Sequence, residues 1–514
     1  MLLVATAMVA QVLGFFRTKL VNANFAGVPA NSPENAGVYF AAFVIPDFVF
    51  FTIAAGALGV AFMPYLSDRL YKGDRKGVWE LSSSLLNLLS IVMLIVGAIM
   101  FIFADLLVDT VVAHGLTHEQ QHNVAVMMRW LALNPMLFTM SGVIAAVQQV
   151  FGRFFFYALA PIFYNLSIIA GIYIFKDNVG IVGLAIGAAI GAILQLLFIL
   201  LGSYGLGFRW RPKIIRTKDF KEMLRQLPPR SLDQGMDQLQ NIVETNIASS
   251  KALGGATAIG NYNSAYVLHT APILLIGTAI STAVFPRLNA RISQGRPDLF
   301  RQDFLRILRL IIWLTLPIVV VSFFGRGYLA RLIFSQESNE ISIIFGSLCV
   351  AILFRTLFAL ISRWFYAQKD TRTPLLVSVF VIFLNILLAY SLSKSYGVAG
   401  LAIAQSIVAT IEVVILGVIM LSRDRKLFDK YFWSEMFRVI SVTGFSLVAG
   451  FMAVQIWPLM SADKGITLLF KLSGITGITL GTHLFVSALF GLDEVKPVFN
   501  WIRRFALRPL RIEY

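Results

Sequence analysis

Hydrophobic stretches of about twenty residues recur along the whole chain and are separated by short polar segments. One of them, residues 85–104, reads LLNLLSIVMLIVGAIMFIFA. About 20 consecutive apolar residues span the ~30 Å hydrocarbon core of a bilayer as one helix. The pattern therefore predicts an all-α polytopic membrane protein with fourteen transmembrane helices. Their expected ranges are 1–24, 37–66, 82–111, 123–149, 154–175, 179–204, 230–249, 258–286, 305–325, 341–366, 373–393, 396–421, 434–459 and 465–490.

The seventh expected span, 230–249, is far more polar than the others. On a helix it carries one apolar stripe, while several polar side chains lie about 100° away from that stripe. The stripe is Leu232, Met236, Leu239, Val243 and Ile247, and the polar set is Asp233, Asp237, Gln240 and Glu244. A charged residue at the bilayer centre costs about 2.5–3.5 kcal/mol, so we expect the stripe to pack and the acids to face a hydrated cavity. Pairing of the acids with nearby arginines is the alternative.

The distribution of lysine and arginine supports a membrane crossing by this polar segment. With fourteen spans and both termini inside, the inside loops hold 31 Lys and Arg and the outside loops hold 6. If residues 230–249 did not cross, the numbers would become 18 and 19. Because short cytoplasmic loops of membrane proteins are rich in Lys and Arg, the segment is predicted to cross and the termini to be cytoplasmic. The net charge of +16 is then explained by a face near anionic lipid, without nucleic acid.

Composition narrows the class further. The chain is 58% hydrophobic and 14% charged, which is unlike a soluble globular domain. Its single cysteine, Cys349, excludes an intrachain disulfide and a cysteine-rich metal site. The first residues lack the features of a cleaved signal, so a retained first span is expected. No phosphate-binding loop, Ser-His-Asp arrangement or dinucleotide fingerprint is present, so we expect no cofactor and a transporter rather than an enzyme.

The chain also repeats itself. Residues 61–75 match residues 283–297 at an offset of 222, and GIVGLAI at 180–186 matches GVAGLAI at 397–403. Gln148 and Asn165 recur as Gln368 and Asn385. Six spans separate equivalent positions, so the two halves share one orientation, as in many transporters. The expected domains are a six-helix bundle at 1–207, a basic cytoplasmic linker at 208–229, a second bundle at 230–430, two additional helices at 431–492 and a basic tail at 493–514.

One motif points to a different class of protein. HEQQH at 118–122 satisfies the H-E-x-x-H pattern, in which two histidines one helical turn apart bind zinc. Thr117 and Gln120 also form a plain helix-start capping box. We favour the capping box, because no distant third ligand is apparent and short motifs often match by chance. The isolated His269 and His483 are interpreted as hydrogen-bonded packing residues rather than metal ligands.

Several stretches carry a resemblance to a known family. FYAQKDTRTP at 365–374 is the most specific stretch. Three others occur along the chain in the same order as in the family: VLGFFRTK at 12–19, FGRFFFYALAPIFYNLSIIAG at 151–171 and QLQNIVETNIAS at 238–249. The chain resembles the MurJ/MviN family of lipid II flippases, within the multidrug and oligosaccharidyl-lipid exporter superfamily. The resemblance implies alternating-access transfer of a polyprenyl-pyrophosphate-linked cell-wall precursor from the inner to the outer leaflet. It also implies that the lipid tail rests between the last two spans.

The resemblance implies a cavity lined by arginines, and here the chain departs from the family. Arg17 is retained, whereas Gln11, Phe50 and Val267 stand at positions where family members carry arginine. The expected substrate-binding residues are Arg17, Arg355 and Asp237. A pyrophosphate is well matched to the two guanidinium groups, and Asp237 belongs to the polar face that is expected to line the hydrated cavity. Lys19, Arg129 and Lys471 are interpreted as snorkelling or paired residues.

Two further groups of residues are expected to act in transport. The resemblance implies an ion-coupling site, for which Glu244, Asn385 and Gln405 are the candidates, with Ala389 where the family has a second carboxylate. The coupling ion is left open between Na⁺ and H⁺, and no metal cofactor is expected. Bending of the paired segments between the two access states is assigned to hinge residues, since proline and glycine allow helices to kink. These hinge residues are Pro46, Gly56, Pro272 and Gly277.

The sequence therefore predicts a lipid II flippase of peptidoglycan biosynthesis in the bacterial cytoplasmic (inner) membrane. Its expected partners are a lipid II-like precursor, membrane lipids and cell-wall synthesis proteins. Two alternatives remain open. One is an exporter of another oligosaccharide-lipid or a drug-like cation, and the other is a cell-wall scaffold that no longer transports.

Overall fold

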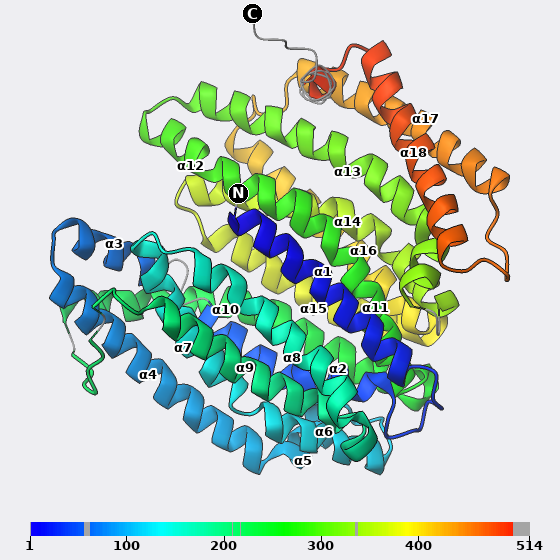
Figure 1. The fold of residues 1–514 in the computed structure, drawn as a ribbon. Helices are drawn as coiled ribbons and strands as arrows, with labels where there is room; N and C mark the ends of the chain where they lie inside the picture. Colours follow the sequence, from blue (N-terminus) through cyan, green and yellow to red (C-terminus); the bar gives the residue numbers. More distant parts are fainter. Residues whose placement is uncertain (1, 56–61, 208, 216, 335–337, 497–514) are drawn as a thin grey trace, which may run out of the picture. The chain divides into compact units, whose positions relative to one another are not determined.

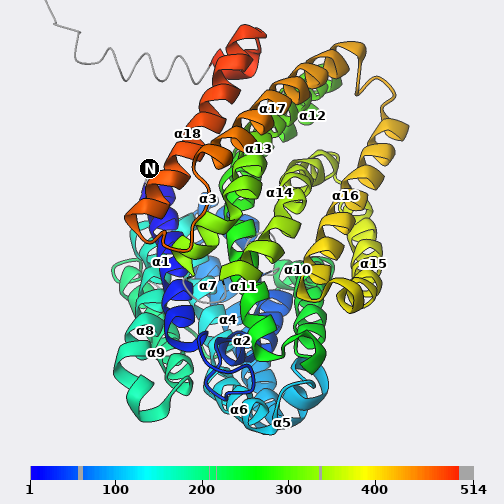
Figure 2. The same cartoon turned by 90° about the vertical axis from the view of Figure 1, so that its right-hand side faces the viewer.

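The fold is entirely helical wherever the structure describes the chain. The computed structural model describes residues 2–55, 62–207, 209–215, 217–334 and 338–496, and every regular element in these ranges is a helix (Figures 1 and 2). Twelve helical segments in them are long and apolar enough to cross a membrane. The predicted all-α polytopic class is confirmed. The expected spans at 1–24 and 230–249 are not among the twelve, so the count of fourteen stays a prediction.

The chain divides into two compact units, Met1–Asn263 and Ser264–Tyr514. The first unit holds α1 (Leu2–Phe25), α2 (Ala36–Phe50), η1 (Phe51–Ala55), α3 (Met63–Tyr71), α4 (Arg75–Ile102), α5 (Ala104–Leu107), η3 (Val108–Val112), α6 (His118–Leu131), α7 (Asn134–Val150), α8 (Phe155–Val179), α9 (Val182–Gly202), α10 (Lys218–Ala248), η4 (Lys251–Leu253) and the start of α11 (Ala256–Pro272). Because α10 begins at Lys218, part of the expected linker 208–229 is helical. The domain boundaries expected from the repeat remain a prediction.

Glycines hold the tightest helix pair of the first unit together. Gly183, Gly187 and Gly191 recur every four residues on α9 and face α8. A Cβ built at Gly187 would lie 2.7 Å from the carbonyl oxygen of Ser167, so only a glycine permits this approach. Small residues at such spacing let membrane helices pack backbone to backbone. Helices α8 and α9 therefore form a close antiparallel hairpin, against which α1 also packs.

The second unit begins inside α11. It continues with η5 (Ile273–Thr278), α12 (Ala279–Ser293), α13 (Pro297–Ile333), α14 (Ser338–Ala367), α15 (Arg372–Tyr396), α16 (Val398–Arg423), α17 (Lys430–Ile456), α18 (Ile466–Leu489) and η6 (Asp493–Val495). Helix α14 is central to this unit, since α13, α16, α12 and η5 all pack on it. Its core includes the fully buried Phe304, Leu360 and Phe365.

The last two membrane helices pack on each other and on α13 (Figure 2). Trp313 of α13 donates a hydrogen bond from Nε1 to Ser487 Oγ of α18 at 2.9 Å. Large apolar side chains on the outer side of both helices are exposed, among them Phe437 and Phe470. Such a surface is stable in lipid but not in water. A resting place here for the substrate's lipid tail is still a prediction.

Local backbone features recur in both halves of the chain. The π-helical segment η1 covers residues 51–55, and the offset of 222 found in the sequence maps it onto 273–277, within the π-helical η5. Glycines with positive φ recur as well: Gly73 and Gly295 have φ of 74° and 66°, and Gly180 and Gly397 have φ of 59° and 62°. L-residues with a side chain rarely adopt such φ values, so equivalent turns in the two halves both require glycine. These features support the internal repeat.

Candidate functional site

Arg17 lies on α1, within electrostatic range of polar side chains on α2 and α8. The guanidinium is half-buried, and its Nε atom is buried without a hydrogen-bond partner among the described residues. Its charge acts on Asp47 and Tyr39 of α2 and on Tyr164 of α8. We call Arg17, Tyr39, Asp47 and Tyr164 the Arg17 cluster. The sequence analysis identified Arg17 but missed Asp47, although an acid in the apolar run AAFVIPDFVF is itself a signal of function.

Phe50 takes part in a group of packed aromatic rings. Phe50, at a position where the resemblance implies arginine, packs edge to face on Phe138 with ring centroids 5.7 Å apart. Phe138 packs in turn on Tyr164 at 5.1 Å. Aromatic packing therefore surrounds position 50 beside the Arg17 cluster.

Arg355 forms a buried ion pair that the sequence analysis did not predict. Its Nη1 lies 3.2 Å from Oε2 of Glu412, and the two side chains are 17% and 2% exposed. Glu412 Oε1 also accepts a hydrogen bond from Ser378 Oγ at 2.7 Å. The second guanidinium nitrogen, Nη2, is 3.5 Å from Gln405 Oε1. Helices α14, α15 and α16 thus supply one polar group, which we call the Arg355 cluster: Arg355, Ser378, Gln405 and Glu412.

A histidine lies in reach of the Arg355 charge. His269 of α11 is 2% exposed, and neither ring nitrogen has a hydrogen-bond partner among the described residues. Arg355 acts on it electrostatically, and its ring lies 5.3 Å from that of Tyr266. His269 lies two residues after Val267, a position where the resemblance implies arginine. His269 is therefore buried, as expected of a packing residue, but the expected hydrogen bond is absent among the described residues.

Glu244, the first predicted ion-coupling residue, is buried in the first unit. Its Oε1 accepts a hydrogen bond from Gln240 Nε2 and its Oε2 accepts one from Tyr262 Oη, both at 2.8 Å. Asn385 and Gln405 belong to the second unit, on α15 and α16, and both are buried. Gln405 lies in the Arg355 cluster. Whether Glu244, Asn385 and Gln405 form one site stays a prediction.

The two faces of α10 differ from expectation. Gln240 and Glu244 are 4% exposed, whereas Met236, Leu239, Val243 and Ile247 of the expected packing stripe are half-buried. The expectation of a wet face is therefore wrong for Gln240 and Glu244, because Tyr262 and Gln240 satisfy the carboxylate inside the protein. The side chains of Asp233 and Asp237 lie outside the described residues, and the substrate-binding role of Asp237 remains a prediction.

The expected hinge residues lie beside the π-helical segments. Pro46 is buried within α2, which leads into η1, and Pro272 directly precedes η5. Gly277 lies in η5, where a Cβ would be 3.0 Å from the Cα of Thr356. Gly56 lies outside the described residues. Single π-helical turns often mark functional irregularities, so both segments are candidates for bending.

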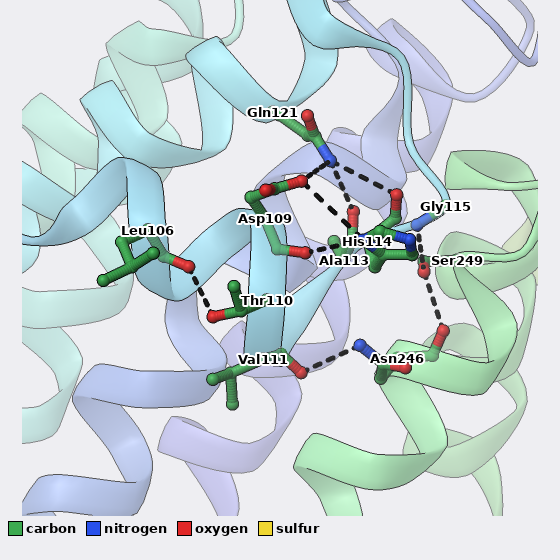
Figure 3. A network of polar contacts seen from close by, with 10 residues as sticks. All are labelled: Leu106, Asp109, Thr110, Val111, Ala113, His114, Gly115, Gln121, Asn246 and Ser249. Atoms are coloured by element: carbon green, nitrogen blue, oxygen red, sulfur yellow. Dashed lines mark hydrogen bonds and ion pairs between the residues drawn. The ribbon is translucent and has the colours of Figure 1, made fainter.

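The HEQQH segment forms the start of α6. Thr117 and Gln120 make both hydrogen bonds of the capping box, so that interpretation is confirmed. His118 and His122 line a cavity of about 470 Å³ together with Asp105, Asp109 and Gln121. Across the described part of the chain, no group of three or more His, Cys, Asp or Glu side chains is placed to hold a metal ion. The segment before α6 is hydrogen-bonded to the end of α10 (Figure 3). Asn246 Nδ2 donates to the Val111 carbonyl at 3.0 Å, and Gly115 N donates to Oγ of Ser249, the C-cap residue of α10, at 3.1 Å.

The FYAQKDTRTP loop is held together by one carboxylate. Asp370 accepts hydrogen bonds from the backbone N–H of Arg372 and from both N–H and hydroxyl of Thr373. Arg423, at the end of α16, pairs with Asp370 at 2.7 Å. Burial alone would raise the pKa of Asp370, but the Thr373 hydrogen bonds and the Arg423 charge lower this pKa to about 2. The loop between α14 and α15 is therefore fixed to α16.

Comparison with known proteins agrees with this architecture. Residues 34–472 match the family model described as lipid II flippase MurJ. A probable lipid II flippase MurJ of Rhizobium tropici is 26% identical over 523 residues, covering 96% of this chain and 94% of the relative. A relative with the same description from Thermotoga maritima is 25% identical over 475 residues, covering 90% and 91%.

Solved structures share the fold. A structure described as lipid II flippase MurJ in an inward closed conformation matches with a TM-score of 0.78 and 22% identity, over 96% of this chain and all of that one. An inward-facing multidrug transporter of the MATE family matches with a TM-score of 0.70 and 17% identity, over 81% and 95%. The repeated helical fold with buried ionic groups defines a multi-pass membrane transporter. The chain belongs to the lipid II flippase MurJ family.

Proposed function

We propose that the protein moves lipid II, the polyprenyl-pyrophosphate-linked peptidoglycan precursor, from the inner to the outer leaflet of the bacterial cytoplasmic membrane. The observation that carries this proposal is the match of residues 34–472 to the lipid II flippase MurJ family. The proposed process is alternating access, with both chain termini in the cytoplasm. The protein would then act in peptidoglycan biosynthesis and cell-wall formation.

The Arg355 cluster offers a physical route to headgroup binding. A guanidinium binds a carboxylate and a phosphate with the same bidentate geometry, so a pyrophosphate competes with Glu412 for Arg355. A bare buried arginine would be costly, and Glu412 compensates its charge in the absence of substrate. We assign Arg355 to an exchange of partners, in which the guanidinium leaves Glu412 when the headgroup arrives. Arg17 is assigned to a second phosphate contact, because its buried Nε–H has no acceptor among the described residues.

Ion coupling is assigned to Glu244 with Asn385 and Gln405. Na⁺ is bound by several oxygen ligands, which carboxylate and amide side chains provide. A proton on Glu244 is the other possibility for this carboxylate. Flipping in proteoliposomes under a Na⁺ gradient or a pH gradient separates the two ions. Glu244→Gln should abolish the response to the active gradient, while the exposed Glu119→Gln should keep it; a full response of Glu244→Gln would remove Glu244 from this role.

Complementation of a bacterium depleted of its own lipid II flippase tests the proposed function. The wild-type chain should restore growth and cell shape, and Arg355→Ala should not. Arg425→Ala, an exposed arginine between α16 and α17, is the matched control. Binding of cell-wall enzymes without rescue would contradict the flippase and favour a scaffold. Transfer of another oligosaccharide-lipid or a drug-like cation in proteoliposomes, without lipid II transfer, would favour the exporter instead.

A further inference from the structure

A short non-helical segment after α9 is held on α4 by hydrogen bonds. We call residues 209–215 the basic strap. Asn87 of α4 donates from Nδ2 to the carbonyl of Arg211 at 2.7 Å and accepts from Trp210 Nε1 at 2.9 Å. The strap's backbone N–H groups at residues 211 and 215 donate to the hydroxyls of Ser83 at 3.2 Å and Ser84 at 2.9 Å. Because side chains of α4 satisfy the strap's backbone, this segment has a defined position without forming a helix.

A cavity of about 810 Å³ lies under the basic strap, bounded by α4, α7 and α9. Its volume is within the ~300–1,000 Å³ range of ligand-binding pockets. The walls are mainly apolar, with Met136, Met140 and Ile144 from α7 and Leu200 from α9. One polar atom in the wall stands out: Ser90 Oγ is buried and has no hydrogen-bond partner among the residues that the structure describes. The cavity is therefore preformed and mainly apolar, with the polar Asn87 and Ser90 in its wall.

The cavity opens onto a surface that is apolar and exposed. Ile91, Leu200 and Trp210 line it and are 51%, 41% and 56% exposed. Leu94 and Ile95, one turn further along α4, are exposed as well. In a membrane-spanning chain such a surface contacts acyl chains. An acyl chain can therefore reach the cavity from the bilayer.

Charge on the basic strap complements an anionic headgroup. Trp210, Pro212 and Ile214 line the cavity, and basic residues alternate with them at 209, 211 and 213. The strap therefore places apolar residues against the cavity and carries basic residues between them. Arg211 is paired with Glu80 at 2.8 Å, while Arg209 and Lys213 are exposed. Basic groups beside an apolar opening attract anionic lipids.

We propose that this cavity binds an acyl chain of an anionic phospholipid, with its phosphate against the basic strap. The strap leads directly into α10, whose N-cap Thr217 accepts a hydrogen bond from Phe220 N at 3.2 Å. A lipid that holds the strap on α4 therefore also holds the start of α10. The site lies within the first unit and uses none of the residues assigned to lipid II or to ion coupling.

Tryptophan quenching by brominated lipids tests this site in the full chain, reconstituted in nanodiscs. The difference between wild type and Trp210→Phe isolates the Trp210 signal. Brominated phosphatidylglycerol should quench this signal severalfold more than brominated phosphatidylcholine at the same mole fraction. Equal quenching by the two lipids would overturn the proposal.

Two pairs of variants locate the binding. Ser90→Phe should fill the cavity and abolish the preference for phosphatidylglycerol, while Ile102→Phe, exposed at the far end of α4, should keep it. Arg209→Gln with Lys213→Gln should reduce the preference, while Arg425→Gln with Lys426→Gln should not. If Ser90→Phe does not fold, Ser90→Leu is the smaller replacement. A preference unchanged by both the cavity and the strap variants would contradict the site.

A competition experiment distinguishes the phospholipid from a polyprenyl chain. Unlabelled phosphatidylglycerol should relieve the quenching of Trp210, and a polyprenyl pyrophosphate should do so less effectively. If the polyprenyl lipid competes at a lower mole fraction, the cavity binds an isoprenoid chain and the proposal is wrong.

Discussion

The guanidinium of Arg355 and the carboxylate of Glu412 form an ion pair between α14 and α16, with Nη1 and Oε2 3.2 Å apart. Glu412 is 2% exposed and Arg355 is 17% exposed, and the polar Ser378 and Gln405 lie beside them. The two charges compensate each other, so removal of either one takes away the opposite charge of this pair. Two kinds of variant, which remove one charge or both, separate the stability of the pair from its role in transport.

Glu412→Gln should destabilise the protein by about 3 kcal/mol, because it leaves a buried arginine without its counter-charge. Arg355→Met with Glu412→Met should be close to wild type in stability, since an apolar pair of similar volume carries no desolvation cost. Thermal unfolding in detergent measures both effects. The double variant should still fail to complement a flippase-depleted strain, because the proposed phosphate contact is absent. Growth with the double variant would contradict the role of Arg355.

Arg17→Ala should abolish lipid II transfer while leaving the amount of protein in the membrane unchanged. The buried Nε–H of Arg17 has no acceptor in the part of the chain that the structure describes, so the substitution should remove a ligand contact rather than an internal hydrogen bond. Lys19→Ala, two residues away and exposed, is the matched control and should transfer lipid II normally. Transfer assays in proteoliposomes with equal protein amounts make the comparison. Normal transfer by Arg17→Ala would remove its assigned role.

Asp370 should make stability depend on pH in the acidic range. Its folded-state pKa is lowered to about 2, whereas an unfolded aspartate has a pKa of about 3.9. The stabilisation is therefore fully present above the unfolded value and is lost as the pH falls through the folded value. Its size is about 1–2 kcal/mol after allowance for partial exposure.

Asp370→Asn should remove this stabilisation at neutral pH and flatten the pH dependence of the unfolding temperature between about pH 5 and 2. Asp298→Asn is the control. That carboxylate is 85% exposed, and its contact with Arg301, at 3.7 Å, is longer than a hydrogen bond. An unfolding profile of Asp370→Asn that overlays the wild type would show that the loop is held by other contacts.

Gly187→Ala should destabilise the packing of α8 on α9. The added Cβ would lie 2.7 Å from a backbone carbonyl oxygen, and overpacking costs about 1–3 kcal/mol. Gly417→Ala on α16 is the control, because nothing lies within 4 Å of its Cβ position. There alanine should stabilise the helix by roughly 0.5–1 kcal/mol. Thermal unfolding temperatures that shift in opposite directions would agree with this; a stabilised Gly187→Ala would mean that the two helices separate easily.

The sequence by itself determined the membrane class, the repeat and the family. Apolar length fixes where helices can cross a bilayer, and two copies of a motif fix equivalent positions such as Gly73 and Gly295. Arg17 and Glu244 could also be recognised, since a charge in an apolar run demands a reason. Asp47 and Glu412 carry the same signal within their own runs and were recoverable in principle.

Only the tertiary structure decided which polar groups satisfy each other. Arg355 and Glu412 are 57 residues apart, and no local pattern states that they meet. The buried face of α10 was likewise set by Tyr262, a residue of the next helix, and not by the periodicity of α10. Hydrophobic periodicity reports the solvent that each segment prefers, whereas the pairing of buried charges depends on which helices pack together. Apolar length along the chain therefore determines which segments form membrane helices. The packing of those helices determines that Arg355 meets Glu412 and that Tyr262 meets Glu244.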